Sequence, residues 1–253
     1  MGMVVTLRGL REERYGRIVC YPRYDSKELE MRLGEMRRMG IRALEFMGGK
    51  NVFEVPVLGK GCVGIVVLAQ TDLGRVALKI RRVDADRDSM RREAEMLKLA
   101  NSVGAGPRLL GFTENLLMMQ FIDGALLPMW IKSIGRAEAA SRIRRILRSV
   151  LEQSWMLDKL GLDHGELSRA PKHIILNDED EPYILDFETA SIVRRASNVT
   201  SICQYLFIKS EISRAITEKL DEINAEELIT VLRIYKRNPT RENFERIIEV
   251  CKL

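Results

Sequence analysis

The first sixty residues show a helical pattern of apolar positions followed by two short apolar runs. Asp25 followed by Glu28 is typical of a capping box and predicts a helix that ends at about Met39. Apolar runs at residues 43–47 and 52–58, separated by a pair of glycines, predict two strands joined by a turn. This helix and hairpin form either a small winged-helix-like unit or an extension of the sheet that follows. The second interpretation is favoured.

From residue 52 to residue 121 the pattern is mostly that of strands. Apolar and β-branched runs alternate with turns that contain glycine or aspartate. One amphipathic stretch, residues 86–101, is followed by Gly104 and predicts a helix. The five predicted strands are residues 55–59, 64–70, 75–80, 108–112 and 116–121.

The remainder of the chain is mostly helical in pattern. Asp123-Gly124 predicts a break, and residues 137–160 predict one long helix. Residues 174–176 and 183–185 predict a short β pair, and helices follow from about residue 199.

These elements predict an α+β protein of two lobes joined near residues 121–124. Residues 1–51 form an N-terminal extension with the helix and hairpin. Residues 52–121 form a lobe with a five-stranded sheet and one helix, and residues 122–253 form a mainly helical lobe.

Composition excludes several classes of protein. With 46% hydrophobic and 30% charged residues, the chain has enough apolar material for a sizeable core, so it is not a disordered chain. Apolar stretches such as residues 63–69 are far shorter than the ~18 residues of a membrane span, so no membrane association is expected. The four cysteines are widely spaced without a C-x-x-C motif, which predicts a reduced, cytoplasmic protein without zinc or disulfides.

The net charge of +5 is unevenly distributed. Residues 1–50 hold eleven basic and seven acidic residues, and residues 142–148 hold four arginines and no acid. Solvated helix faces are the simpler interpretation. The alternative is a phosphate-binding surface, for which we expect only weak, salt-sensitive binding of RNA through the basic N-terminal segment.

Residues 59–66 fit the pattern G-x-G-x-x-G-x-V, with glycines at Gly59, Gly61 and Gly64. Glycines allow backbone N–H groups to approach phosphates where a Cβ atom would obstruct. The pattern alone is weak, because spaced glycines also mark hairpins. A dinucleotide-binding interpretation fails, because the loop leads into a strand and not into a helix.

Lys79 ends an apolar strand in the sequence Val-Ala-Leu-Lys and needs a partner if it points inward. At about 100° per residue, Glu93 falls within the apolar stripe of the next helix and Glu95 falls on its solvent side. A carboxylate in a buried stripe is costly unless it is paired. We therefore predict an ion pair between Lys79 and Glu93.

Both histidines of the chain follow the long predicted helix. His164 lies in Asp-His-Gly-Glu-Leu, His173 precedes the β pair, and Asp186 follows in Leu-Asp-Phe-Glu. The order of glycine loop, lysine, glutamate, H-x-[DE]-L and D-F resembles the protein kinase-like fold over residues 52–210. It most resembles RIO-type and related small archaeal Ser/Thr kinases.

The resemblance implies ATP and Mg²⁺ or Mn²⁺ as cofactors. It implies that Lys79 contacts the α and β phosphates and is held by Glu93, and that Gln120, Phe121 and Ile122 fall where the hinge meets adenine. The implied nucleotide-binding residues are Gly59, Lys60, Gly61, Gly64, Val66, Lys79, Glu93, Gln120 and Ile122.

The resemblance also implies the catalytic and metal-binding residues. Glu166 stands at the position of the catalytic aspartate, with Lys79 and Asp186 completing the catalytic set. The implied metal ligands are Asp186, His173 and Glu188.

The chain departs from the kinase pattern in five ways. Glu166 replaces the catalytic aspartate and is one methylene longer. Six residues rather than four separate Glu166 from the position of the metal-binding asparagine, and His173 occupies that position. His173 lies thirteen residues before Asp186, which supports that register. Glu188 replaces the glycine of D-F-G and adds a carboxylate. No A-P-E motif follows, so the segment that docks peptides is absent or very short.

The predicted function is an atypical serine/threonine protein kinase that transfers the γ-phosphoryl group to an unknown protein or small-molecule acceptor. Loss of both the catalytic aspartate and the metal-binding asparagine favours the alternative of an ATP-binding pseudokinase. The missing docking segment favours a small-molecule kinase of the same fold. A further alternative gives the main role to residues 1–50, acting on RNA.

Overall fold

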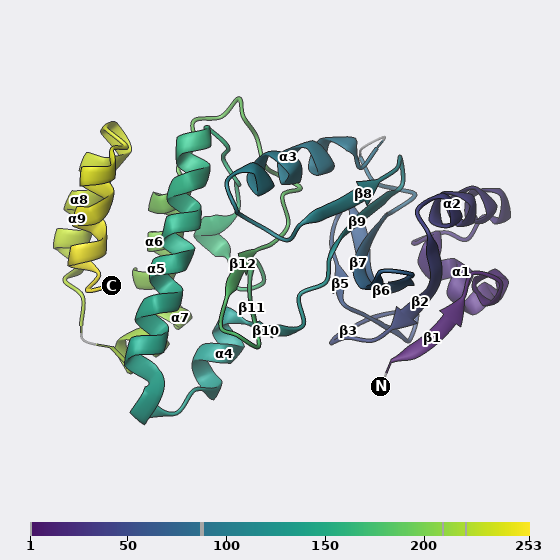
Figure 1. Ribbon diagram of the computed structural model, residues 1–253, viewed down its shortest axis with the longest axis horizontal. Helices are drawn as coiled ribbons and strands as arrows, with labels where there is room; N and C mark the ends of the chain where they lie inside the picture. The colour runs from purple at the N-terminus through teal and green to yellow at the C-terminus, as the bar shows by residue number, and fades with distance from the viewer. Residues whose placement is uncertain (1, 87–88, 209, 221) are drawn as a thin grey trace. The chain divides into compact units, whose positions relative to one another are not determined.

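The computed structural model describes residues 2–86, 89–208, 210–220 and 222–253, without the side chains of residues 136–138. The chain forms two compact units (Figure 1). Unit 1 comprises Met1–Glu95 and Arg108–Phe121, and unit 2 comprises Met96–Pro107 and Ile122–Leu253. One unit boundary falls at Phe121–Ile122, whereas the predicted division at residue 51 does not coincide with a boundary between compact units.

Unit 1 is built on an antiparallel sheet with the strand order β1-β2-β6-β7-β9-β8, and β5 pairs with β6. A separate hairpin consists of β3 (Lys50–Val52) and β4 (Val55–Val57). The strands of the main sheet are β1 (Met3–Thr6), β2 (Ile41–Phe46), β5 (Gly59–Lys60), β6 (Gly64–Thr71), β7 (Gly74–Arg81), β8 (Leu109–Phe112) and β9 (Leu116–Gln120).

The sheet extends further than the sequence predicted. The predicted pairing of residues 43–47 with residues 52–58 is wrong, because β2 pairs with β1 on one side and β6 on the other. The extension of the sheet is therefore the correct alternative, and the main sheet has seven strands instead of five. Strand β1 was missed because only Val5 of its four residues is buried, which leaves no readable alternation.

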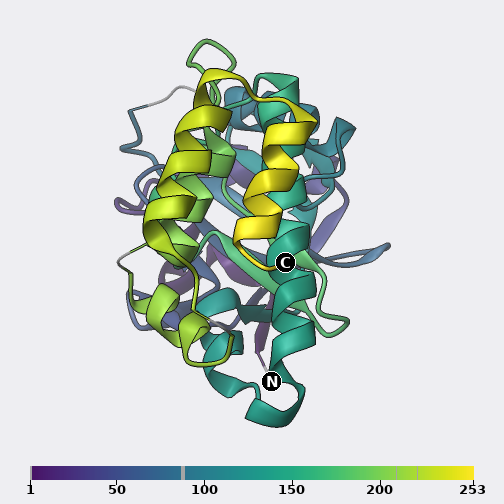
Figure 2. The same ribbon diagram turned by 90° about the vertical axis from the view of Figure 1, so that its left-hand side faces the viewer.

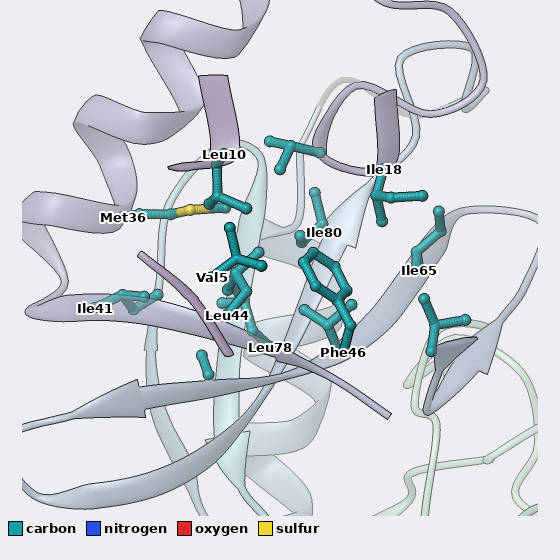
Figure 3. Packing of buried hydrophobic residues seen from close by; sticks show 14 of the residues in the cluster. Val5, Leu10, Ile18, Met36, Ile41, Leu44, Phe46, Ile65, Leu78 and Ile80 are labelled. Atoms are coloured by element: carbon teal, nitrogen blue, oxygen red, sulfur yellow. The ribbon is translucent and has the colours of Figure 1, made fainter. Parts of the chain in front are cut away.

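The N-terminal helices cover the core of unit 1. These are the 3₁₀ turn η1 (Gly9–Arg11), α1 (Glu13–Val19) and α2 (Ser26–Arg38). The predicted cap of α2 is present, since the Asp25 side chain accepts a hydrogen bond from the Glu28 N–H at 2.8 Å. Figure 3 shows Leu10, Ile18 and Met36 from these elements packed with residues of the sheet such as Leu44 and Phe46.

Arg32 of α2 is a fully buried cation that ties the N-terminal helices to the sheet. Its Nε donates to Glu28 at 2.6 Å. Its Nη1 donates to the carbonyl of Val19 at 2.8 Å and to the carbonyl of Arg81, and its Nη2 donates to Asn115 at 3.4 Å. An N-terminal arginine is thereby bonded to the end of β7, the strand that carries Lys79.

Several other N-terminal arginines are also ion-paired. Arg11 bonds to Glu30 through two contacts of 2.6 and 2.7 Å, and Arg42 pairs with Asp72. The basic excess of this segment is therefore partly neutralised on the surface of unit 1. Binding of RNA by this segment stays a prediction.

Helix α3 (Arg91–Ser102) begins later than predicted. The Ser89 hydroxyl accepts a hydrogen bond from the Arg91 N–H at 3.0 Å, as a residue preceding a helix does. Residues 86, 89 and 90 are not helical, so the predicted start at residue 86 is wrong. Residues 87–88 of that prediction lie outside the described residues.

Unit 2 is mainly helical, as expected. Its long helix α5 is capped at its C-terminus by Gly161, which adopts a left-handed conformation with φ +74°. Figure 2 shows α8 and α9 side by side. The helices wholly within this unit are α4 (Leu127–Ser133), α5 (Arg136–Leu160), α6 (Asn198–Phe207), α7 (Glu211–Thr217), α8 (Ala225–Arg237) and α9 (Arg241–Val250).

A three-stranded sheet in unit 2 contains the predicted β pair, β11 (Ile174–Asn177) and β12 (Pro182–Ile184). The third strand, β10 (Gly124–Leu126), pairs with β11 at the point where the sequence predicted a break. A Cβ atom at Gly124 would lie 1.7 Å from the Leu176 carbonyl oxygen, so glycine is required there by close backbone approach. No helix in the described parts of the chain has the length and apolar content to cross a membrane.

Candidate active site

The glycine loop of unit 1 connects β5 to β6. The Gly61 N–H donates to the Gly64 carbonyl at 2.8 Å. A Cβ atom at Gly59 or Gly61 would meet no other atom within 3.4 Å, so packing of the chain does not require glycine at either position. The space beside these two α-carbons is therefore unfilled by the described chain, which leaves room for a ligand close to the loop.

Gly64 has a different role from the other two glycines. A Cβ atom there would lie 3.0 Å from both the Lys79 Cγ and the Ile80 carbonyl oxygen. Glycine therefore allows β6 to pass close to the stem of Lys79, while Val66 stands opposite Lys79 in the β6–β7 register.

The predicted ion pair is present in unit 1. Lys79 Nζ lies 2.8 Å from Glu93 Oε1, and the two side chains are 5% and 4% exposed. Glu95 is exposed, as the helical periodicity predicted. Two charged groups held away from water are costly to fold, so such a pair is retained for specificity or for use by a ligand more readily than for stability.

The residues predicted to meet adenine lie at a unit boundary. Gln120 ends β9 in unit 1, where its Oε1 accepts a hydrogen bond from the Arg108 N–H at 3.3 Å. The Phe121 ring lies under the Arg75 guanidinium at 5.2 Å. Ile122 is buried and is the first residue of the second segment of unit 2. Their contact with a nucleotide stays a prediction.

His164 bonds to the loop that carries Glu166 and to the residue that precedes Asp186. Its Nε2 lies 3.0 Å from the Leu185 carbonyl oxygen, and its Nδ1 accepts a hydrogen bond from the Glu166 N–H at 3.4 Å. A carbonyl only accepts, so we assign the proton to Nε2. His164 therefore fixes the backbone at Glu166 and at the residue before Asp186 with a single neutral ring.

Burial lowers the pKa of His164 to about 4. The unfolded chain binds a proton at this residue below about pH 6.5, whereas the folded chain resists protonation until about pH 4. We therefore expect the free energy of unfolding to fall as the pH is lowered from about 6.5 to about 4, by up to about 1.4 kcal/mol per pH unit. Urea denaturation across this range measures the slope, which should be shallower in His164→Gln. An identical slope in this variant would exclude His164 as its source.

His173 is almost fully buried beside Glu166. Its Nε2 lies 3.1 Å from Glu166 Oε2, and Glu166 itself remains 39% exposed. Burial lowers the pKa of His173, while the charges of Asp186 and Glu166 act in the opposite direction. A Glu166 carboxylate with one side against a ring and the other toward solvent is suited to meet a ligand from outside.

Asp186 adopts a left-handed backbone conformation with φ +69°, which is uncommon for a residue other than glycine. The next residue, Phe187, is 2% exposed and its ring lies 5.0 Å from that of His164. Burial of Phe187 turns the chain so that Asp186 and Glu188, on either side, stay partly exposed. Strained residues of this kind concentrate at functional sites.

Binding of a metal ion by Asp186, His173 and Glu188 stays a prediction. Among the described residues, no group of three or more histidine, cysteine, aspartate or glutamate side chains is arranged to hold a metal ion. Magnesium sites in phosphoryl-transfer proteins usually hold one or two carboxylates, with water and substrate phosphates completing the shell. Asp186 and Glu188, both partly exposed, meet that limited requirement, and the buried His173 lies near Asp186 with its Nε2 3.1 Å from Glu166.

Sequence reasoning missed the residues that hold the His164 segment. Asn198 Oδ1 accepts from the His164 N–H at 2.8 Å, and the Thr189 hydroxyl donates to the His164 carbonyl at 2.9 Å. Asn198 in turn donates to Asp158 at 2.8 Å. Arg194 bonds to Asp163 at 2.8 Å. These contacts join positions 25 to 40 residues apart in the chain, and no local pattern indicates them.

Comparison with known proteins identifies the family. The model of the RIO domain matches residues 71–199. The chain belongs to the RIO domain family. This RIO protein is therefore a member of an atypical protein kinase-like family.

The matched residues include the Lys79–Glu93 pair and the site carboxylates Glu166, Asp186 and Glu188. The match begins after the glycine loop. The RIO protein is also 28% identical over 103 residues to an uncharacterized protein of Methanocaldococcus jannaschii. That alignment covers 41% of the present chain and 84% of its relative.

Proposed function

We propose that this RIO protein is an ATP-dependent phosphotransferase that acts as an atypical serine/threonine protein kinase. The observation that carries the proposal is the buried Lys79–Glu93 pair, at 2.8 Å, against the glycine loop. A buried cation that is paired with a carboxylate and lies beside a glycine loop is suited to bind phosphate oxygens.

Unit 1 supplies the groups that hold the nucleotide. The open backbones at Gly59 and Gly61 approach the phosphates, and the Lys79 ammonium binds the α and β phosphate oxygens while Glu93 fixes its position. Gln120 borders the adenine, together with Ile122 of unit 2. In this proposal unit 1 binds the nucleotide and contributes no acid or base to the reaction.

Unit 2 supplies the acidic groups. Asp186, supported by Glu188, holds the divalent cation, which neutralises charge on the phosphates when bound. His173 is assigned to the support of Glu166 rather than to metal binding, because its ring is buried against that carboxylate.

Glu166 is the proposed base of the reaction. Its carboxylate orients the acceptor hydroxyl and takes the proton from it as the phosphoryl group is transferred. The partly exposed position of Glu166 suits this role, since the acceptor arrives from solvent. The contact with His173 at 3.1 Å limits the rotation of the carboxylate.

An exposed cysteine reports on the glycine loop. All four cysteines lie in described residues, and Cys62 of the loop is exposed, whereas Cys20, Cys203 and Cys251 are buried. We expect saturating Mg·ATP to slow the alkylation of Cys62 by iodoacetamide at least about tenfold, because the bound phosphates cover the loop. Mass spectrometry of the modified peptide measures the rate.

The matched variants for this measurement are Asp186→Asn and Asp178→Asn. Asp178 is exposed in the turn between β11 and β12, so its variant should protect Cys62 as the wild type does. Asp186→Asn should require more Mg·ATP for the same protection. Equal protection curves for Asp186→Asn and the wild type would refute the metal assignment.

A second candidate function is an ATP-binding regulator without transfer activity. Its support is that Glu166 and His173 replace the catalytic aspartate and the metal-binding asparagine of the kinase pattern, and that these two side chains lie 3.1 Å from each other. Incubation of the protein with γ-labelled ATP, Mg²⁺ or Mn²⁺ and a cell extract separates the candidates. Label on serine or threonine of proteins supports the proposal, label on a small molecule indicates a small-molecule kinase, and no label together with Cys62 protection indicates the regulator.

A further inference from the structure

A tyrosine from the N-terminal segment lies against the glycine loop. The Lys60 ammonium lies 4.7 Å from the centre of the Tyr21 ring, and the Arg82 guanidinium lies 5.0 Å from it. Lys60 is the residue between the first two glycines of the loop. We call Tyr21, Lys60 and Arg82 the loop clamp.

Backbone hydrogen bonds fix the loop clamp from both sides. The Val83 N–H donates to the Tyr21 carbonyl at 2.9 Å, and the Arg82 N–H donates to the Val63 carbonyl at 2.8 Å. The Arg82 Nη1 reaches the Gly61 carbonyl at 3.3 Å. One arginine therefore contacts both the aromatic ring and the backbone of the glycine loop.

Neighbouring side chains hold the clamp in place. Asp84 pairs with two nitrogens of Arg82, each at 2.8 Å, which sets the plane of the guanidinium. The Phe53 ring lies 5.5 Å from the Tyr21 ring, and the Arg17 guanidinium lies 4.3 Å from the centre of Phe53. Tyr21 therefore also contacts the Phe53 ring of the β3–β4 turn.

We propose that Tyr21 is a positioning residue that holds the glycine loop in the conformation that receives the nucleotide. The proposal rests on the proposed function. A loop with three glycines has many accessible conformations, and binding must select one of them. Cation–π contacts to Lys60 and Arg82 restrict the loop beforehand, so that less conformational freedom is lost when the nucleotide binds.

The inference also gives residues 1–51 a role in the proposed reaction. Their contribution is to affinity for the nucleotide and not to the transfer step, because Tyr21 contacts Lys60 of the glycine loop and Arg82, which bonds to the Gly61 carbonyl. Loss of the ring should raise the KM for ATP and leave kcat unchanged.

The test compares Tyr21→Leu, Tyr21→Phe and the control Tyr24→Leu. Phenylalanine keeps the ring that attracts cations, whereas leucine removes it. Tyr24 belongs to the same segment, but its ring lies against Gly16 of α1. Two quantities are measured on each protein: the alkylation rate of Cys62 without nucleotide, and the dissociation constant for Mg·ATP.

We expect Tyr21→Leu to raise both the alkylation rate of Cys62 and the dissociation constant for Mg·ATP by about tenfold. Tyr21→Phe and Tyr24→Leu should match the wild type. In a double variant with Lys60→Met, Tyr21→Leu should add less loss than it causes alone, because the contact between Tyr21 and Lys60 is already broken.

Each arm has a separate consequence. An unchanged Cys62 rate in folded Tyr21→Leu would overturn the clamp. A faster Cys62 rate with unchanged affinity for Mg·ATP would overturn its role in nucleotide binding. If the wild type does not bind Mg·ATP, the proposed function fails, and the alkylation rates still decide whether Tyr21 restrains the loop.

Discussion

We expect Glu166→Gln to lower the rate of phosphoryl transfer by about 10²–10⁴, the range for loss of a general base, while the affinity for Mg·ATP hardly changes. Glutamine keeps the size of the side chain and the position beside His173 but cannot take a proton. The groups proposed to hold the nucleotide are the glycine loop, Lys79 and Asp186, none of which this change removes. Transfer rate and ATP affinity are measured on the same preparation.

Two variants make this experiment specific. Glu179→Gln removes an exposed carboxylate from the β11–β12 turn of the same unit and should leave transfer unchanged. Glu166→Asp has the carboxylate of the kinase pattern but a shorter reach, so we expect a loss there as well. Transfer in Glu166→Gln at the wild-type rate would remove Glu166 from the mechanism. Asp163, the next acidic residue in the sequence, is a poor substitute because it is buried and paired with Arg194.

The second large effect is expected on stability. Arg32→Met should lower the free energy of unfolding by about 3–5 kcal/mol, the range for removing one partner of a buried ionic group. The change leaves the Val19 and Arg81 carbonyls without the guanidinium that now bonds to both, and it leaves Glu28 without its ion-pair partner. Denaturant unfolding of ligand-free protein measures the loss.

Arg37→Met is the matched control for Arg32→Met. Arg37 lies on the exposed side of the same helix, so its replacement should change the free energy of unfolding by less than about 0.5 kcal/mol. Equal effects of the two variants would contradict the account of Arg32 as the residue that joins α2 to the end of β7.

The sequence was most informative where local periodicity and chemistry agreed. The Lys79–Glu93 pair followed from the cost of a lone carboxylate in the apolar stripe of one helix, and both residues lie within a short stretch of chain. The same holds for the cap of α2 at Asp25 and for the β pair of unit 2. In each case the decisive contacts are local or follow directly from a buried charge.

Contacts between distant segments could not be predicted in this way. Strand β1 is recognisable only by its pairing with β2, some forty residues later, because its own burial pattern is nearly featureless. Tyr21 meets Lys60 across a similar separation, and no motif marks either residue for that contact. The glycine at position 124 signalled a break in sequence, but the cause of that glycine is the neighbouring backbone of Leu176.

His173 illustrates a second limit. Its position relative to Asp186 matched the kinase register, and from sequence its imidazole was a reasonable metal ligand. Burial decides how a histidine is used, and burial depends on the packing of the whole loop. In the structure the ring is 1% exposed and faces Glu166, which supports a role in holding the base.

The most direct test of the proposed function is the transfer of γ-label from ATP to protein serine and threonine by wild type and by Lys79→Met. The change removes the ammonium proposed to bind the phosphates, and the ligand-free melting temperature of each protein verifies folding. The account predicts labelling by the wild type and a rate about 10²–10³ lower in folded Lys79→Met, as for loss of a preorganised group that stabilises transition-state charge. Equal labelling by both proteins, or no labelling by a wild type that binds Mg·ATP, would contradict it.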